Sequence, residues 1–323
     1  MKKLFLLTLA VLFTNLNAQQ EEQEEYTAYL EQALEAVNNK DVKGFSTNFS
    51  YFSTAIEQEY VTPEILTKEN FELYTQCLLS ALNEGYLSWQ YFNPGNVKFL
   101  EYDVDNHPEN MILLAYLYLT GNTNIPQDTD KAIDWGGKAL EKGNEDALTI
   151  LTAICPVNLN QVTDPGSQCE KTQNSIKKAA EMGVFIAMTA LADYYFYTSK
   201  EYEKAIQWYE KAFQSGNIYQ KAQVADKMSD AYKLYSPVYS GKKAKHWKAE
   251  YVSCLEKYVN EYEKNRTPDP KDPEFSKYQS GLMHLALSYL YSIGVKNKKK
   301  GEFYRDKACK NGVETNLCVN YKP

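Results

Sequence analysis

The chain has 323 residues, in which 35 Lys and Arg face 42 Asp and Glu, for a formal net charge of −7. This acidic balance argues against a nucleic-acid partner, because neutralising phosphates requires a basic surface. The length suffices for one extended repeat array or for two compact domains.

The first eighteen residues have the pattern of an export signal. Lys2 and Lys3 precede an apolar run from Leu4 to Phe13, and a short polar stretch ends at Ala18. This order is typical of a secretory signal peptide. The apolar run is too short to cross a bilayer, which needs about 20 residues. We therefore predict a signal peptide over 1–18, with a buried N-terminal helix as the alternative, and expect the mature chain to be exported and to contain no transmembrane segment.

Residues 19–106 have helical periodicity without a clear repeat. The expected helices span Glu21–Val37, a stretch near Phe45–Glu59, and Glu69–Glu84. We interpret this part as a divergent N-terminal helical region that caps or extends the fold formed by the rest of the chain.

From residue 107 onward the sequence repeats itself, which indicates stacked supersecondary units. Three segments share a Leu-Ala pair, a tyrosine three residues later, and a second helix with a Lys-Ala pair and a closing glycine. They are Leu114-Ala115, Tyr118, Lys131-Ala132-Ile133, Trp135, Lys138-Ala139 and Gly143; Leu191-Ala192, Tyr195, Lys204-Ala205-Ile206, Trp208, Lys211-Ala212 and Gly216; and Leu285-Ala286, Tyr289, Gly294-Val295, Tyr304, Lys307-Ala308 and Gly312.

The element Ala-x-x-x-Gly closes five expected helices, at Gly85, Gly143, Gly183, Gly216 and Gly312. Each glycine can adopt the left-handed conformation that ends a helix, and each alanine lets two helices cross closely. No segment has the period-two alternation of a sheet. We therefore predict an all-α fold.

These residues resemble Sel1-like repeats, the relatives of tetratricopeptide repeats. The resemblance implies a right-handed α-solenoid of antiparallel helix pairs over 107–323, with a Pro-rich insertion near 265–274. It also implies a scaffold that binds another protein, which the signal peptide would place in the periplasm or outside a bacterial cell. Ala115, Ala192 and Ala286 depart from the family pattern, which has glycine there, and residues 218–264 hold at most a degenerate unit with Trp247.

Two cysteine pairs are local in the sequence, and an exported chain permits disulfides. Cys309 and Cys318 flank the turn after Gly312, and Cys155 and Cys169 flank a loop with the turn Pro165-Gly166. Six cysteines allow fifteen complete pairings, among which the sequence cannot choose, and we expect a bridge within each of these two local pairs. Cys77 and Cys254 lie on apolar helix faces and are expected to be buried free thiols.

No pattern of residues indicates catalysis, a metal or a cofactor. The three histidines, His107, His246 and His284, lack the spacing of metal ligands, and the sequence has neither a phosphate-binding glycine loop nor a nucleophile elbow. The lysine cluster from Lys296 to Lys300 is interpreted as solvated surface, with an anionic lipid or a polyanion as the alternative.

Tyrosine is the remaining candidate for binding, with 27 copies in the chain. Tyr118, Tyr195 and Tyr289 fall on the core tyrosine of the family. Tyr116, Tyr194, Tyr197 and Tyr291 fall between core positions of the first helices, which in such arrays face the concave surface. We take these four as the candidate binding residues, with ordinary partly exposed tyrosines as the alternative.

The leading hypothesis is a non-enzymatic scaffold or adaptor of the bacterial cell envelope that holds another protein or an extended peptide. The first alternative is a protein that binds the cell wall or a polysaccharide through the same tyrosines. The second alternative is an envelope hydrolase, related to the cysteine-rich Sel1-like proteins, with a nucleophile and base assembled across repeats.

Overall fold

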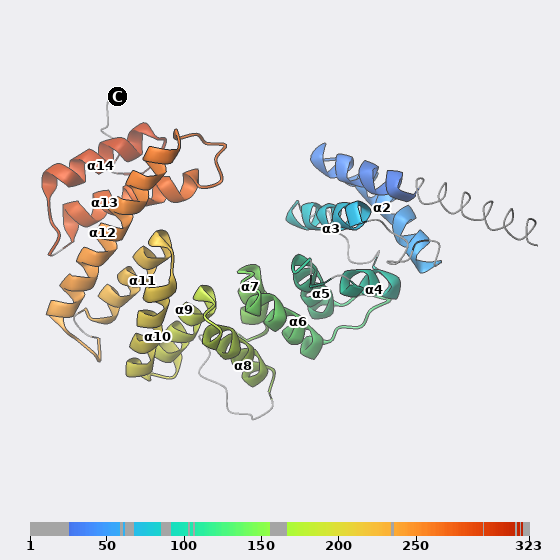
Figure 1. Ribbon diagram of the computed structural model, residues 1–323, viewed down its shortest axis with the longest axis horizontal. Helices are drawn as coiled ribbons and strands as arrows, with labels where there is room; N and C mark the ends of the chain where they lie inside the picture. Colours follow the sequence, from blue (N-terminus) through green and yellow to red (C-terminus); the bar gives the residue numbers. More distant parts are fainter. Residues whose placement is uncertain are drawn as a thin grey trace, which may run out of the picture. The chain divides into compact units, whose positions relative to one another are not determined.

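The computed structural model describes residues 26–58, 61, 68–84, 92–102, 104–105, 107–155, 167–233, 236–292, 294–313, 315–316 and 318. The expected signal peptide, Gly85 and the turn Pro165-Gly166 lie outside these residues. The described residues form helices and no strand, which confirms the all-α prediction (Figure 1). The chain divides into unit 1, Met1–Pro156 with Val162–Lys178, and unit 2, Val157–Gln161 with Ala179–Pro323.

Unit 1 begins with the divergent region and continues into the first repeat. Its helices are the segment 26–38, α2 (Val42–Glu57), α3 (Lys68–Asn83), α4 (Pro94–Tyr102), α5 (Glu109–Thr120), α6 (Thr129–Glu141), α7 (Asp146–Ile154) and most of α8 (Gln168–Glu181). The first three agree with the sequence prediction, whereas α4 was not predicted. Phe99 and Leu100 of α4 belong to the same hydrophobic core as Leu113 and Leu117 of α5, so the core runs on from the N-terminal region into the first repeat.

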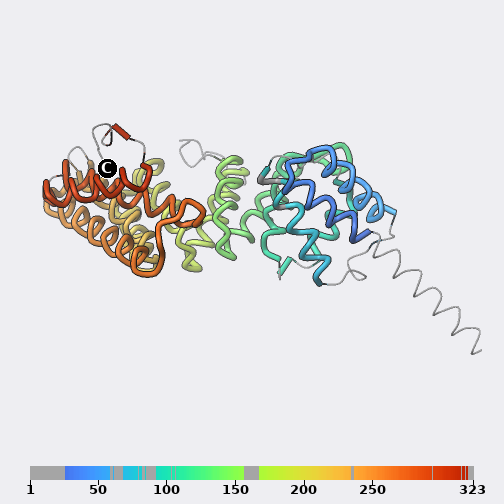
Figure 2. Tube along the Cα trace, turned by 90° about the horizontal axis from the view of Figure 1, so that it is seen from above, coloured from blue at the N-terminus to red at the C-terminus, as the bar shows by residue number. Residues whose placement is uncertain are grey.

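Unit 2 is built from three helix pairs. Its helices are α9 (Phe185–Asp193), the π-helical turn η2 (Tyr194–Thr198), α10 (Tyr202–Ser215), α11 (Ile218–Ala231), α12 (Gly241–Asn265), α13 (Phe275–Tyr291) and α14 (Lys298–Lys310). Helix α9 packs on α10, α11 on α12 and α13 on α14. Figure 2 follows the course of this part of the chain, from yellow-green to red. The pair α11–α12 occupies the segment in which the sequence indicated at most a degenerate unit.

The predicted Pro-rich insertion is the loop between α12 and α13. Hydrogen bonds hold it to α12, because Tyr262 Oη donates to Asp272 at 3.0 Å and Tyr258 Oη donates to Glu274 at 3.3 Å. The insertion therefore extends the chain without separating the helices on either side of it.

Three described glycines end their helices in the predicted left-handed conformation. Gly143, Gly183 and Gly312 have φ values of 86°, 90° and 79°. The next residue in each case donates its backbone N–H to the carbonyl of the alanine that opens the motif, as Asn144 does to Ala139 at 3.0 Å. This six-to-one hydrogen bond is the Schellman arrangement, which satisfies an otherwise orphan carbonyl.

The same prediction is wrong for Gly216, whose φ is −67° and whose backbone is extended. Asn217 follows it directly and caps α11, where its side chain accepts from the Gln220 N–H at 2.9 Å. Because the next helix begins at once, the chain has to leave α10 in an extended conformation instead of a left-handed turn. The alanines of all these motifs are fully buried, as expected for close helix crossings.

Candidate functional site

The three repeats share one contact between their two helices. Lysine Nζ of the second helix lies over the ring of the core tyrosine of the first helix. The pairs are Lys131 over Tyr118 at 4.7 Å, Lys204 over Tyr195 at 5.4 Å and Lys300 over Tyr289 at 5.0 Å. The cation is attracted by the negative face of the ring, which fixes the register of each helix pair.

A second lysine in each repeat covers a ring on its own helix. Lys138 lies 4.1 Å from the ring of Trp135, and Lys211 lies 3.9 Å from the ring of Trp208. In the third repeat Lys307 covers Phe303 at 5.3 Å, because the position of the tryptophan is taken by the buried Tyr304. These lysine–aromatic pairs are part of the framework that positions the candidate binding residues.

The four candidate tyrosines divide into two exposed and two half-buried residues. Tyr197 in η2 and Tyr291 at the end of α13 are 53% and 66% exposed, and they occupy equivalent positions of their repeats. Tyr194 and Tyr116 are half-buried. Tyr194, Tyr197 and Tyr291 belong to unit 2, whereas Tyr116 belongs to unit 1. Tyr197 and Tyr291 are therefore the candidates whose rings are most available to a partner.

Four consecutive aromatic residues, Tyr194 to Tyr197, make up most of η2, and none of its residues is buried. The π-helical turn replaces the longer connection of the first repeat, because α10 begins only four residues after η2 ends. Lys200 takes a left-handed φ of 60° in this short connection, and its Nζ donates to the Tyr197 carbonyl at 2.6 Å. Single π-helical turns inside helices are frequent at functional sites.

Beside this turn lies a polar network that the sequence did not reveal. Tyr209 of α10 donates from Oη to Asp193 Oδ1 at 2.5 Å, and Lys227 of α11 donates to the other oxygen, Oδ2, at 2.7 Å. Burial and the neighbouring carboxylate raise the pKa of Tyr209, so its phenol stays protonated and can donate. The equivalent positions to Asp193 hold Tyr116 and Leu287, so no repeated pattern could point to it.

Comparison with protein families identifies the repeats. The family model described as the Sel1 repeat matches residues 109–144, 186–217 and 280–313. The chain contains three Sel1 repeats. They coincide with the pairs α5–α6, α9–α10 and α13–α14. Such repeats are scaffolds that fit a protein-binding adaptor. No curated protein matches the sequence at a significant level.

Several solved structures match much of the chain at low sequence identity and with TM-scores below 0.5. A Sel1 repeat protein from Oxalobacter formigenes is 17% identical, with 87% of this chain and 99% of that chain covered and a TM-score of 0.37. An immunity protein from Pseudomonas aeruginosa is 18% identical, with coverages of 85% and 86% and a TM-score of 0.35. A protective antigen of uropathogenic Escherichia coli with an SLR fold is 15% identical, with coverages of 90% and 70% and a TM-score of 0.32.

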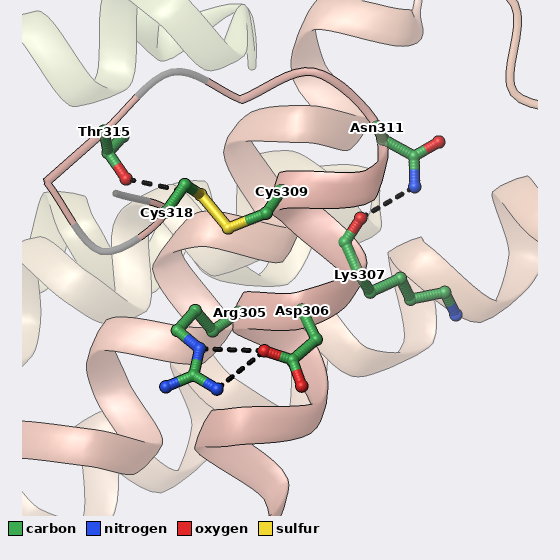
Figure 3. Close-up of a disulfide and its surroundings, with 7 residues drawn as sticks. All are labelled: Arg305, Asp306, Lys307, Cys309, Asn311, Thr315 and Cys318. Carbon is green, nitrogen blue, oxygen red and sulfur yellow. Dashed lines mark hydrogen bonds and ion pairs between the residues drawn. A yellow bond between two sulfur atoms is a disulfide. The ribbon is translucent and has the colours of Figure 1, made fainter. Parts of the chain in front are cut away.

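Both local cysteine pairs are disulfides, which confirms that prediction. The bridge Cys155–Cys169 joins α7 to the first turn of α8, with its Cα atoms 5.0 Å apart. The bridge Cys309–Cys318 ties the last Sel1 repeat to the C-terminal tail, with its Cα atoms 5.5 Å apart (Figure 3). Cys77 and Cys254 are buried free thiols, as expected. Burial raises the pKa of Cys77 to about 12, so this thiol is unreactive in the folded protein.

The three histidines take part in packing and hydrogen bonds. His284 Nδ1 lies 2.7 Å from Tyr251 Oη, the His246 ring contacts Trp247, and His107 packs against Phe71. Within the described ranges, no three His, Cys, Asp or Glu side chains gather as metal ligands would. The same ranges contain no helix with the length and apolar composition that crossing a bilayer requires.

Proposed function

We propose that this protein is a non-enzymatic scaffold of the bacterial cell envelope, whose Sel1 repeats hold another protein or an extended peptide. The observation that carries this proposal is the pair of exposed tyrosines, Tyr197 and Tyr291, at the same position of two Sel1 repeats. A tyrosine ring offers a large amphipathic contact area at a low cost in conformational entropy, which suits a binding surface.

The framework under these tyrosines supports a role in binding. Lys204 and Lys300 each cover the core tyrosine of the same repeats, and Asp193 links α9 to α10 and α11. A surface that is held rigidly loses less entropy when a partner binds, and this strengthens binding without additional contacts.

The two disulfides support the assignment to an oxidising compartment. Such bridges persist in secreted and periplasmic proteins and are rare in the cytosol of mesophilic bacteria. Together with the charge and apolar pattern of residues 1–18, they favour export through a cleaved signal peptide. Mass spectrometry of the protein from the envelope and the medium would locate its first residue, which we expect to be Gln19.

Site-specific photocrosslinking in the native cell tests the binding surface. A photoreactive amino acid at position 197 or 291 is expected to crosslink one discrete protein. The matched controls are positions 51 and 102, because Tyr51 and Tyr102 are about as exposed, at 55% and 56%, but lie in unit 1 outside the repeats. Positions 116 and 194 are expected to crosslink the same protein less efficiently, because both side chains are half-buried.

With the crosslinked protein in hand, Tyr197→Ala and Tyr291→Ala are each expected to weaken its binding about tenfold or more, as for a central aromatic contact. Tyr102→Ala is expected to leave the binding unchanged. Equal crosslinking at all six positions would overturn the proposal. Crosslinks to cell-wall glycan alone, without a protein, would replace it with the polysaccharide-binding alternative.

A further inference from the structure

Two lysine-rich segments that are distant in the sequence lie together in unit 2. The first two turns of α12 contain Lys242, Lys243, Lys245 and Lys248, and the connection into α14 contains Lys296 and Lys298–Lys300. Lys245 Cγ lies 3.1 Å from the point where a Cβ atom would stand on Gly294, two residues before Lys296. Figure 1 shows the start of α12 and the turn into α14 at the same end of their helix pairs.

Helices α12 and α14 run parallel beside this junction. Lys300 Nζ donates to Glu256 of α12 at 2.8 Å, and seven residues further on Lys307 donates to Glu263 at 2.6 Å. The N-termini of both helices therefore face the same way, and the lysines lie near them. Each N-terminus adds the partial positive charge of the helix macrodipole to the charge of the lysines.

Four of these lysines are exposed and unpaired, and we name them together the lysine patch: Lys242, Lys245, Lys296 and Lys299. Within the part of the chain that the structure describes, none of the four makes an ion pair or a hydrogen bond through its ammonium group. Nearby acidic residues are occupied, because Asp226 pairs with Lys248 at 2.9 Å and Glu256 pairs with Lys300. No ion pair within the described residues therefore compensates the lysine patch, although the chain as a whole is acidic.

The position of these lysines is unfavourable for the helices themselves. The corresponding second helices α6, α8 and α10 have an acidic residue in the first turn, namely Asp130, Glu170 and Glu203. The first turns of α12 and α14 have no acidic residue and two or three lysines each. A positive charge at a helix N-terminus opposes the macrodipole. Lys243, Lys298 and Lys300 have partners within the fold, whereas in the described part of the chain Lys242 and Lys299 gain no such contact in exchange.

Two exposed aromatic side chains flank the lysine patch. Tyr239 is 57% exposed and folds over the start of α12, with its Oη 3.0 Å from the Cβ position of Gly241. Phe303 is 58% exposed and follows Lys299 by one helical turn. Lysines beside exposed aromatic rings are typical of surfaces that contact a bilayer, where the charges face acidic headgroups and the rings lie at headgroup depth.

The chemistry of lysine is compatible with a diffuse anionic surface. Arginine recognises a single phosphate or carboxylate through two parallel hydrogen bonds, whereas lysine acts as a flexible point charge. The lysine patch contains no arginine, and nearby Arg305 is paired with Asp306 at 2.7 Å. A bilayer with many acidic headgroups fits this chemistry better than one bound phosphate group.

We propose that the lysine patch, with Tyr239 and Phe303, docks this protein onto a bilayer that is rich in anionic phospholipid. The lysine patch adjoins Tyr291, the candidate binding tyrosine at the end of α13, five residues before Lys296. A lysine near such a surface contributes about fivefold to the association constant, so four of them contribute a hundredfold or more. The attraction is screened within a Debye length, so binding is expected to fall steeply as salt rises.

Sedimentation with vesicles tests this proposal on the purified full protein. The vesicles contain phosphatidylglycerol mixed into phosphatidylcholine, and pure phosphatidylcholine vesicles serve as the lipid control. The test variant carries Lys242→Glu, Lys245→Glu, Lys296→Glu and Lys299→Glu. A matched control carries Lys43→Glu, Lys98→Glu, Lys257→Glu and Lys264→Glu, which changes the net charge equally at exposed lysines elsewhere. Circular dichroism verifies that both variants are folded.

We expect binding to the phosphatidylglycerol vesicles to fall a hundredfold or more in the test variant and less than tenfold in the control variant. Phe303→Ser is expected to weaken binding at a salt concentration at which charge attraction is screened. Equal losses in the two variants would overturn the proposal, as would equal binding to pure phosphatidylcholine. A soluble acidic polysaccharide that binds the patch, while vesicles do not, would also overturn it and assign the patch to a glycan.

Discussion

Asp193 of α9 and Lys227 of α11 form an ion pair between helices of two successive pairs in unit 2. Lys227 Nζ lies 2.9 Å from Asp193 Oδ1 and 2.7 Å from Oδ2. The same carboxylate accepts the hydrogen bond of Tyr209, which lies on the helix between them in the sequence. One side chain thus joins three consecutive helices next to the exposed Tyr197, and its loss affects stability and the shape of the binding surface together.

Asp193→Ala is expected to destabilise the protein by about 1–3 kcal/mol, because the largely buried Tyr209 hydroxyl loses its acceptor and stays unpaired. Tyr209→Phe removes the hydroxyl and its need for a partner, so its cost should be smaller. Urea unfolding of both single variants and of the double variant measures the coupling between the two residues. Additive losses would show that the hydrogen bond does not contribute.

Removing the bridge between Cys155 and Cys169 with two serines is expected to cost about 3 kcal/mol, because the bridge closes a loop of 14 residues in the unfolded chain. The bridge between Cys309 and Cys318 closes a loop of 9 residues and should contribute slightly less. Urea unfolding with and without reductant measures both contributions. Cys254→Ser is a control that should not alter the response to reductant, since Cys254 is a free thiol.

Gly143→Ala is expected to destabilise the protein by about 1 kcal/mol, purely because φ at this position is 86° and nothing lies within 4 Å of a new Cβ atom. Gly143→Asn should cost less, since asparagine tolerates the left-handed conformation better. Thermal unfolding of the two variants separates backbone strain from steric contact. Equal costs for alanine and asparagine would contradict the assignment to backbone strain.

Gly216→Ala tests the exception among these glycines. Its φ of −67° suits any residue, but a Cβ atom would lie 3.0 Å from Phe185 Cε2 and 3.2 Å from the Ala212 carbonyl. The cost should therefore come from crowding, and Phe185→Leu should relieve part of it in the double variant. A double variant in which the two losses add would exclude this explanation.

The pairing of Glu256 makes stability depend on pH. Its partial burial opposes ionisation, but hydrogen bonds from Lys300 and Tyr304 outweigh this and lower the pKa of the carboxyl below its ordinary value. Because the folded pKa is the lower one, the pairing stabilises the fold above the ordinary glutamate pKa of about 4.3 and is lost as the pH falls through the folded value.

Comparing the protein with Glu256→Gln from about pH 7 to about pH 3 tests this dependence. The difference in the free energy of unfolding should be largest near neutral pH and shrink as the pH falls, because the native carboxylate becomes protonated and then resembles the amide. Urea unfolding at each pH gives this difference. A difference that stays constant over the whole range would exclude the charged pairing as its cause.

The sequence by itself determined most of the helices, the helix ends at three glycines and the three repeats. The repeats could be recognised because their motif residues lie close together in the sequence. Examples are Leu114, Leu191 and Leu285, each followed four residues later by a tyrosine. The helix ends at Gly143, Gly183 and Gly312 could be predicted because only glycine adopts the left-handed conformation without steric cost, whatever the fold. The pairs Cys155–Cys169 and Cys309–Cys318 were open to prediction because each lies across a single short connection.

Only the tertiary structure decided which distant side chains meet. The Asp193 network joins residues up to 34 positions apart, and nothing about one aspartate indicates its partner on another helix. The cluster from Lys296 to Lys300 stood out in the sequence, but only the packing of the turn at Gly294 against α12 brings Lys245 beside it. Local propensities decide where helices form. Which side chains of different helices become neighbours depends on how the helices cross, because side-chain packing between them sets their register.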